Sequence, residues 1–205
     1  MTLEPAVLRG STNFGWYVIP LLLVVIYVYA VEAEKKNWKG IMAALAFWGL
    51  DMFNEIWNAL VWHFTGTPLW GEPTNTAYLI LIGLNIETTF MFAIMGIVST
   101  KMIPKDKDAK IFGKLPNRLV IAVVMAVACV FIEILLNLAG ALVWAYPFWS
   151  LSFPLLIILI GYFPFWFIAF KVFDARDMKT RVKIVATILL VDLVLVVIFM
   201  PIGWI

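Results

Sequence analysis

Cysteine and histidine are almost absent from this sequence, which contains one of each, Cys129 and His63. A single cysteine excludes a disulfide framework within the chain, and the shortage of both residues excludes the usual zinc spacings. Gly-rich phosphate loops, a nucleophile elbow and Asp-rich diphosphate motifs are missing as well. These absences remove most of the familiar chemistry of soluble enzymes, and they predict neither a metal site nor a cofactor.

Charged residues are also scarce. Only 14% of the 205 residues are charged and 64% are hydrophobic, whereas a typical soluble domain is about 25% charged and roughly 45–50% apolar. The mean hydropathy of +0.99 agrees with this. The net charge is +2, and the basic residues lie in short loops beside apolar segments, which is not a nucleic-acid signature. The composition therefore predicts a protein whose partner is the lipid bilayer.

Six apolar stretches are long enough to cross a bilayer, which takes about 20 residues of helix. Because the backbone must satisfy its own hydrogen bonds in lipid, each stretch is predicted to be helical. The predicted fold is an all-α polytopic membrane bundle, with residues 1–205 forming a single transmembrane domain. The stretches lie near residues 14–32, 39–64, 76–100, 118–144, 151–173 and 182–204.

The basic residues predict how the chain is oriented. Of the fifteen Lys and Arg, all but Arg9 lie in the first, third and fifth loops, at 33–39, 101–118 and 171–183. The second and fourth loops carry none. Because Lys and Arg collect in cytoplasmic loops, these three loops are predicted to be cytoplasmic and both termini to lie outside.

Five acidic residues lie inside the predicted helices, with no basic residue at the same depth: Asp51, Glu55, Glu87, Glu133 and Asp192. All except Glu55 are expected within about 3 Å of the bilayer midplane, given a rise of about 1.5 Å per residue. An ionised side chain there costs about 3 kcal/mol. These carboxyl groups are therefore predicted to face the bundle interior and one another, and at least two of them to be protonated at neutral pH.

Amide and aromatic side chains accompany the acids, several of them at helical spacing on the same faces. Amides could hydrogen-bond a ligand, and Trp rings could line a cavity, although packing is the commoner role of each Trp alone. In the neutral loops, Trp70, Tyr146 and Trp149 are typical of an interfacial anchoring belt. The predicted substrate-binding residues are Asn58, Asn85, Glu133, Asn137, Trp48, Trp57, Trp62 and Trp144.

Three roles fit such a cluster of intramembrane acids. Protonated acids and asparagines can simply hydrogen-bond helices together. Acids inside a membrane also mark proton or ion paths. Finally, a carboxylic acid kept neutral by an apolar site can protonate a substrate, and aromatic rings can stabilise the resulting carbocation. The sequence alone leaves these alternatives open.

The segment Asp51-Met-Phe-Asn-Glu-Ile-Trp-Asn-Ala-Leu-Val-Trp62, with Trp38-Lys-Gly40 before it, resembles the second span of the small integral-membrane terpene cyclases of fungal meroterpenoid and indole-diterpene pathways. In that family an Asn, a Trp and a Glu precede an Ile and a Leu-Val-aromatic ending. The family Glu matches Glu55, and a lone Asp in the last span matches Asp192. The family has a Trp where this sequence has Asn54, and it is usually given seven spans.

The resemblance implies that Glu55 and Asp192 are the acids that protonate an epoxide or an olefin. Asp51 and Glu87 would then hydrogen-bond the acids or relay protons. The resulting hypothesis is a membrane-embedded isoprenoid cyclase or isomerase whose substrate comes from the bilayer. A proton- or cation-coupled transporter or channel that uses the same acids is the alternative, and a non-catalytic lipid-binding subunit is the third possibility.

Overall fold

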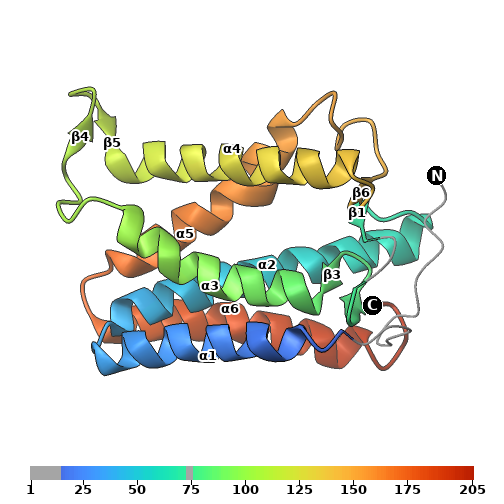
Figure 1. Ribbon diagram of the computed structural model, residues 1–205, viewed down its shortest axis with the longest axis horizontal. Helices are drawn as coiled ribbons and strands as arrows, with labels where there is room; N and C mark the ends of the chain where they lie inside the picture. The colour runs from blue at the N-terminus through green and yellow to red at the C-terminus, as the bar shows by residue number, and fades with distance from the viewer. Residues whose placement is uncertain (1–14, 73–75) are drawn as a thin grey trace.

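The computed structural model describes residues 15–72 and 76–205 of the chain. Over these residues the chain forms six α-helices, which run back and forth between the two ends of the molecule (Figure 1). They are α1 (Val18–Glu34), α2 (Trp38–Thr65), α3 (Ile86–Met102), α4 (Asn117–Leu138), α5 (Phe163–Phe173) and α6 (Met178–Phe199). The loops with the basic residues lie at one end, opposite the loops without them (Figure 1).

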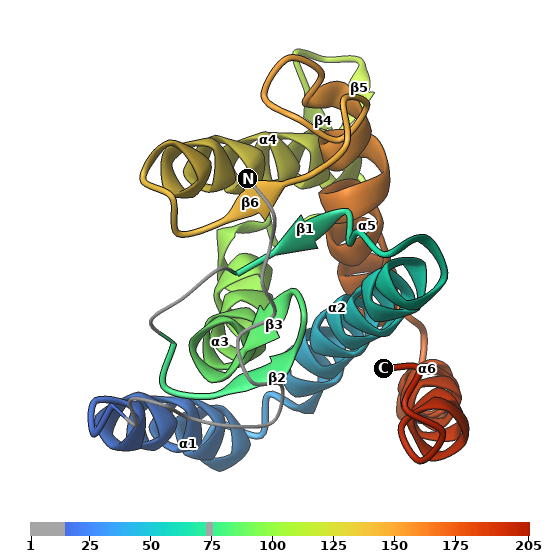
Figure 2. The same cartoon turned by 90° about the vertical axis from the view of Figure 1, so that its right-hand side faces the viewer.

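Short antiparallel strand pairs close three of the loop regions. The pairs are β1 (Trp70–Gly71) with β6 (Val143–Trp144), β2 (Leu79–Leu81) with β3 (Leu84–Asn85), and β4 (Lys110–Ile111) with β5 (Leu115–Pro116). The β1–β6 pair joins the loop after α2 to the loop after α4, so two distant parts of the sequence meet at the neutral end (Figure 2).

Helix α2 lies at the centre of the bundle and packs against α3, α5 and α6. Small residues permit this close packing: Ala43, Ala44 and Ala46 are fully buried. On α3, a Cβ added to Gly96 would lie 2.6 Å from Cα of Ala44, so only glycine allows the two backbones to approach this closely. The acids of α2 are buried because the helix that carries them is surrounded by other helices.

The third helix starts ten residues later than the apolar run at 76–100 predicts. Asn85 caps α3, since its side-chain oxygen accepts a hydrogen bond of 2.7 Å from the backbone N–H of Thr88. The preceding apolar residues form the β2–β3 hairpin instead of a helical turn. Glu87 therefore lies in the first turn of α3, and the prediction that it lies in the middle of a helix is wrong.

The fourth helix ends six residues earlier than predicted. Leu138 is its last residue, and Gly140 follows with a φ of +73°, a left-handed conformation that favours glycine. Trp144 consequently lies in β6, off the helical stripe that was predicted for it. Glu133 lies one to two turns from the end of α4, so it also lies away from the middle of its helix.

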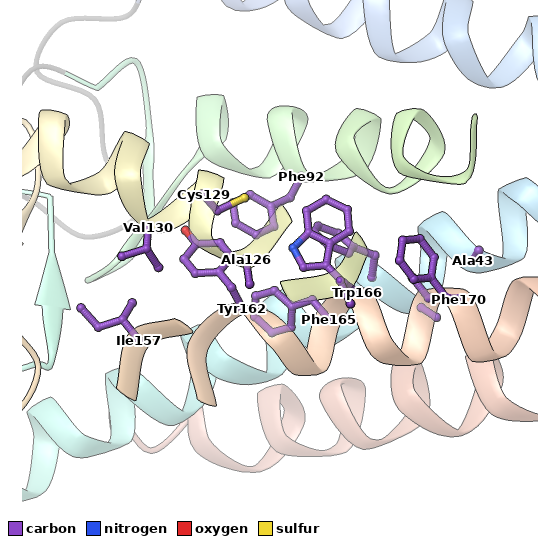
Figure 3. Packing of buried hydrophobic residues seen from close by; sticks show 14 of the residues in the cluster. Ala43, Phe92, Ala126, Cys129, Val130, Ile157, Tyr162, Phe165, Trp166 and Phe170 are labelled. Carbon is purple, nitrogen blue, oxygen red and sulfur yellow. The ribbon is translucent and has the colours of Figure 1, made fainter. Parts of the chain in front are cut away.

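The hydrophobic core fills the space between α2, α3, α4 and α5 (Figure 3). Phe47 of α2 contacts Trp166 of α5 with ring centroids 4.4 Å apart, and it also contacts Phe92 of α3 at 5.6 Å. Before α5 the chain forms a π-helical segment, η1 (Ile157–Tyr162), which ends two residues before Pro164. This segment turns Tyr162 toward Phe92 and Cys129 (Figure 3).

Helices α4 and α6 present apolar side chains to the outside. Both are long and apolar enough to cross a membrane, and only 22% and 11% of their most apolar stretches are buried. On α6, Leu190 and Val197 are about 60% exposed. Lipid chains would cover such a surface, since water would not be tolerated over so many exposed apolar side chains.

Candidate functional site

A pocket of about 110 Å³ lies between α2, α3, α4 and η1, near the end of the bundle where the neutral loops lie. Four acids line it, and no Lys, Arg or His is among its lining residues. The polar lining consists of Asp51, Asn54, Glu55, Glu72, Thr88 and Glu133. The aromatic and sulfur-containing lining consists of Trp70, Trp149, Phe92, Phe165, Tyr162, Met91, Met95 and Cys129.

Glu55 lines this pocket from α2. Its Oε1 accepts a hydrogen bond of 2.9 Å from the indole nitrogen of Trp70. Its Oε2 is buried and has no hydrogen-bond partner among the described residues. The whole residue is 5% exposed. One carboxyl oxygen is thus fixed by the protein, and the other makes no hydrogen bond to the described residues.

Trp70 is held in place by α2. The side chain of Asn58 donates a hydrogen bond of 2.8 Å to the backbone carbonyl of Trp70 and accepts one of 2.8 Å from the backbone N–H of Leu69. The ring of Trp70 stacks on Trp149 with centroids 5.5 Å apart. A Cβ at Gly83 would lie 2.5 Å from the indole nitrogen, so glycine is required beside it.

The prediction that Trp70 and Trp149 anchor the protein at the membrane interface is wrong. They are 9% and 5% exposed and line the pocket. The reason is that the loop after α2 folds back onto the bundle and pairs with the loop after α4 through β1 and β6. Tyr146, the third member of the predicted belt, is half-buried and bonds Thr65 and Thr67.

Asp51 and Glu133 complete the group of predicted acids in the pocket. Asp51 lies one turn before Glu55 on α2, is 3% exposed, and has an Oδ2 without a partner among the described residues. Glu133 comes from α4 and accepts a hydrogen bond of 2.7 Å from the hydroxyl of Tyr162. Carboxyl groups from two separate helices therefore meet around one pocket, as predicted for these three residues.

Glu72 is a pocket acid that the sequence did not reveal. It follows β1 and accepts hydrogen bonds from the side chain of Asn85 and from the hydroxyl of Thr88, the latter at 3.1 Å. Burial raises the pKa of the Glu72 carboxyl to about 8, and the nearby carboxylates of Glu87 and Glu133 add to the increase. Because it belongs to a loop, its sequence position gave no sign of burial.

Glu87 lies outside the pocket lining. Its carboxylate accepts hydrogen bonds from the hydroxyl of Tyr17, from the hydroxyl of Thr76 at 2.7 Å and from the backbone N–H of Ala77 at 2.8 Å. It therefore joins the start of α1 and the β2 approach to the first turn of α3.

Asp192 lies outside the pocket lining as well, against the other face of α2. A Cβ added to Gly49 would lie 3.6 Å from its Oδ2. Successive helical residues are about 100° apart, so Gly49 is roughly 120–160° around α2 from Glu55 and Asp51. Both carboxyl oxygens of Asp192 are buried without a partner among the described residues. The structure therefore does not bring Asp192 and Glu55 together.

None of the predicted amides lines the pocket. Asn58 fixes the loop at Trp70, and Asn85 caps α3 while donating to Glu72. Asn137 is half-buried near the end of α4. Asn58 and Asn85 thus position the pocket residues Trp70 and Glu72 without lining the pocket themselves.

The four predicted Trp residues also lie outside the lining. Trp57 is 43% exposed, and the other three are half-buried. Trp48 packs on the main core, Trp62 on a smaller one, and Trp144 pairs with Trp70 across β1 and β6. Two other Trp residues, Trp70 and Trp149, line the pocket in their place.

The side chains that line the pocket suit the binding of a proton or a cationic group. Carboxyl groups attract positive charge, and aromatic faces do the same through their ring quadrupoles. Among the described residues, no three Asp, Glu, His or Cys side chains come close enough together to hold a metal ion. The arrangement is that of separated acids around an aromatic, largely apolar space.

Fold and pocket together define a helical protein with two candidate membrane spans, α4 and α6, and a carboxyl-lined pocket in its interior. The chain belongs to an uncharacterized membrane protein family, whose model matches residues 3–201. An uncharacterized protein of Archaeoglobus fulgidus is 53% identical over 195 residues, which cover 95% of this chain and 92% of the relative. No solved structure matches the chain. The family confirms the class of membrane protein that the composition predicts.

Proposed function

We propose that this membrane protein protonates an isoprenoid lipid and so starts its cyclisation or isomerisation, with Glu55 as the acid. The setting of the Glu55 carboxyl carries the proposal. Trp70 holds Oε1, while Oε2 is buried beside the pocket without a partner among the described residues. An apolar site favours the neutral form of a carboxylic acid, which is the form that can donate a proton.

The proposed reaction is balanced within the substrate and the protein. The proton moves from Glu55 to one carbon of a substrate double bond, and a carbocation forms at the neighbouring carbon. In cyclisation, the electron pair of a second double bond closes the ring. Loss of a proton from a carbon beside the final cation restores a double bond and returns a proton to a pocket carboxylate. The product is an isomer of the substrate, so the reaction needs no further reactant.

The aromatic lining supports the cationic intermediate. Trp70 and Trp149 stack at 5.5 Å, and Phe92 and Tyr162 stack at 6.2 Å in the same pocket. An aromatic face attracts a desolvated cation by about 2 kcal/mol. These rings also exclude water, which would otherwise capture a carbocation as an alcohol.

The other pocket acids fit the return of the proton. Asp51 lies one turn from Glu55 on the same helix, and Glu133 approaches from α4 with its Oε1 bonded to Tyr162. We assign to these two residues the acceptance and relay of protons. Glu87 and Asp192, which lie outside the lining, have no contact with substrate in this proposal.

We also infer that the six helices cross the membrane with the basic loops in the cytoplasm. The placement of the loops 33–39, 101–118 and 171–183 at one end of the molecule supports this inference. Both termini would then lie outside, and the pocket would lie in the outer half of the membrane. Protease digestion of sealed vesicles, with tags in the β4–β5 loop and at the C-terminus, tests this orientation.

The activity is tested with purified protein in lipid nanodiscs and linear polyprenols as substrates. Gas chromatography with mass spectrometry should detect isomeric products with the wild type and none with Glu55→Gln. Glu34→Gln, an exposed acid at the basic end, is the matched control and should keep full turnover. Full turnover by Glu55→Gln would overturn the assignment.

A transporter or channel for protons or organic cations is the second candidate. The four carboxyl groups around the pocket, with no basic residue in the lining, favour it. It requires a water-filled path from at least one side of the membrane. Proton or cation flux into protein-containing liposomes, lost in Glu55→Gln, would support transport. A protein that produces neither flux nor isomers, yet binds isoprenoids, would instead be a lipid-binding subunit.

A further inference from the structure

We infer that the isoprenoid chain reaches Glu55 sideways from the membrane, through an opening between α3 and α4. This inference rests on the proposed function, because it names the route by which that substrate enters the pocket. Substrates that dissolve in lipid need such a route, since the mouth of a pocket facing water would not admit them.

The opening is seen in residues that line the pocket and are also exposed on the outer surface. Met91 of α3 is 45% exposed, and Ile132 and Leu136 of α4 are 50% and 42% exposed. A residue can have both properties only at the boundary between the pocket and the surroundings. The pocket therefore opens laterally along these two helices.

The packing of the helices explains why the opening lies at this place. Helices α3 and α4 each pack against α5, and α3 packs against α2, but α3 and α4 make little contact with each other. Figure 2 shows them standing apart at the neutral end, on the side away from α6. The sulfur atoms of Cys129 and Met95, 3.8 Å apart, bridge the two helices.

The chemistry of the opening matches a hydrocarbon chain. Its rim is formed by Met91, Ile132 and Leu136, which carry no charge. Two of the acids lie on α2 and Glu72 follows β1, while the carboxylate of Glu133 on α4 is bonded to the hydroxyl of Tyr162. Met and Leu side chains are flexible enough to move aside for a chain of irregular shape. An isoprenoid could leave its tail among the lipids and place a terminal double bond at Glu55. The pocket volume of about 110 Å³ suits the end of such a chain better than the whole of it.

Carbodiimides test the route, because they react with protonated carboxyl groups and exist in lipid-soluble and water-soluble forms. Protein in sealed liposomes is treated with dicyclohexylcarbodiimide or with its water-soluble dimethylaminopropyl analogue, and modified Glu55 is measured by peptide mass spectrometry. The lipid-soluble reagent should modify Glu55 at least tenfold faster. Equal rates, or faster modification by the water-soluble reagent, would overturn the route.

Two pairs of variants locate the route. Met91→Trp with Ile132→Trp fills the opening and should slow modification by the lipid-soluble reagent at least fivefold. Leu190→Trp with Leu193→Trp, placed on the exposed face of α6, should leave the rate unchanged. An unchanged rate in the first pair would overturn the inference.

A widening variant covers the case in which the Trp variants fail to fold. Ile132→Ala with Leu136→Ala should accelerate the lipid-soluble reagent but not the water-soluble one, whereas unfolding would accelerate both. These measurements need no turnover. Loss of the route with retained isomerisation, or the reverse, therefore shows which of the two proposals fails.

Discussion

The indole nitrogen of Trp70 donates a hydrogen bond of 2.9 Å to Oε1 of Glu55, which joins a loop residue to an acid at the centre of the bundle. The loop therefore takes part in the site, although it lies outside the helices. Because the bond occupies one carboxyl oxygen, it restricts the rotation of the Glu55 carboxyl beside the pocket. The position of the acid depends on the fold of this loop.

Replacing Trp70 by Phe tests this relationship. The substitution keeps an aromatic ring but removes the donor and leaves Oε1 of Glu55 buried without it, so we expect stability to fall by about 1–3 kcal/mol. We also expect the initial rate of isomerisation to fall, because the Glu55 carboxyl can rotate. Thermal unfolding and product formation measure the two effects. Turnover at the wild-type rate would show that the bond does not orient the acid.

Asn58 should be the most important structural amide in the site. Its substitution by Leu leaves the backbone N–H of Leu69 and the carbonyl of Trp70 buried without partners. Each such group costs about 1–3 kcal/mol, so a large decrease in the unfolding midpoint is expected. Asn137→Leu, at a half-buried position on α4, is the matched control and should shift the midpoint little. Similar effects from both substitutions would contradict the role of Asn58.

Stability should depend on pH through Glu72. Burial raises the pKa of this carboxyl to about 8 in the folded protein, compared with about 4.3 for an unperturbed Glu. Between these two values the folded protein holds a proton that the unfolded chain has lost, so stability decreases as the pH rises. The stability contributed by this proton is fully present below the unfolded pKa of about 4.3. It is lost by the folded pKa of about 8, and above that pH stability no longer changes through Glu72. Unfolding midpoints between pH 4 and pH 9 should decline in the wild type and decline less in Glu72→Gln. Equal slopes would contradict the burial of this acid.

Close contact between α2 and α3 should make Gly96 intolerant of any side chain. An added Cβ would lie 2.6 Å from Cα of Ala44, a backbone atom that cannot move alone. We expect Gly96→Ala to cost about 1–3 kcal/mol through overpacking. Val98→Ala, at a 44% exposed position on the same helix, is the control and should have a small effect. A neutral Gly96→Ala would show that the two helices lie further apart.

Replacing Asp192 by an apolar residue should make the protein more stable. Both its oxygens are buried without a hydrogen-bond partner among the described residues. An unpaired buried polar group is unfavourable, and an apolar group of similar size removes that cost. Asp192→Leu should therefore raise the unfolding midpoint, with Val191→Leu on the exposed face as the control. A lower midpoint would indicate that Asp192 has a partner in the membrane.

The helices could be predicted because their length and apolar character are local properties of the sequence. The basic segments 33–39, 101–118 and 171–183 each span a junction between two helices of the structure and include the helix ends on both sides. The late start of α3 had a readable signal, since Asn85 and Thr88 are spaced as a helix cap. The continuous apolar run around it obscured that signal.

The site was harder to predict because it depends on contacts between distant segments. Asp51, Glu55 and Glu133 could be identified from their depth and spacing in the sequence. The sequence around Asn58 does not show that its side chain binds the loop that carries Trp70 and Glu72. The position of Asp192 depends on which face of α2 meets α6. That choice is made by Gly49 and its neighbours, and a pattern within one helix does not show it.

Turnover in heavy water tests most directly the claim that Glu55 gives its proton to a carbon of the substrate. The acid exchanges its proton with the solvent, so each product molecule formed in D₂O should carry one deuterium on its carbon skeleton and be one mass unit heavier. Glu55→Gln should give no such product. Isomeric products without deuterium, or labelled products from Glu55→Gln, would contradict the account.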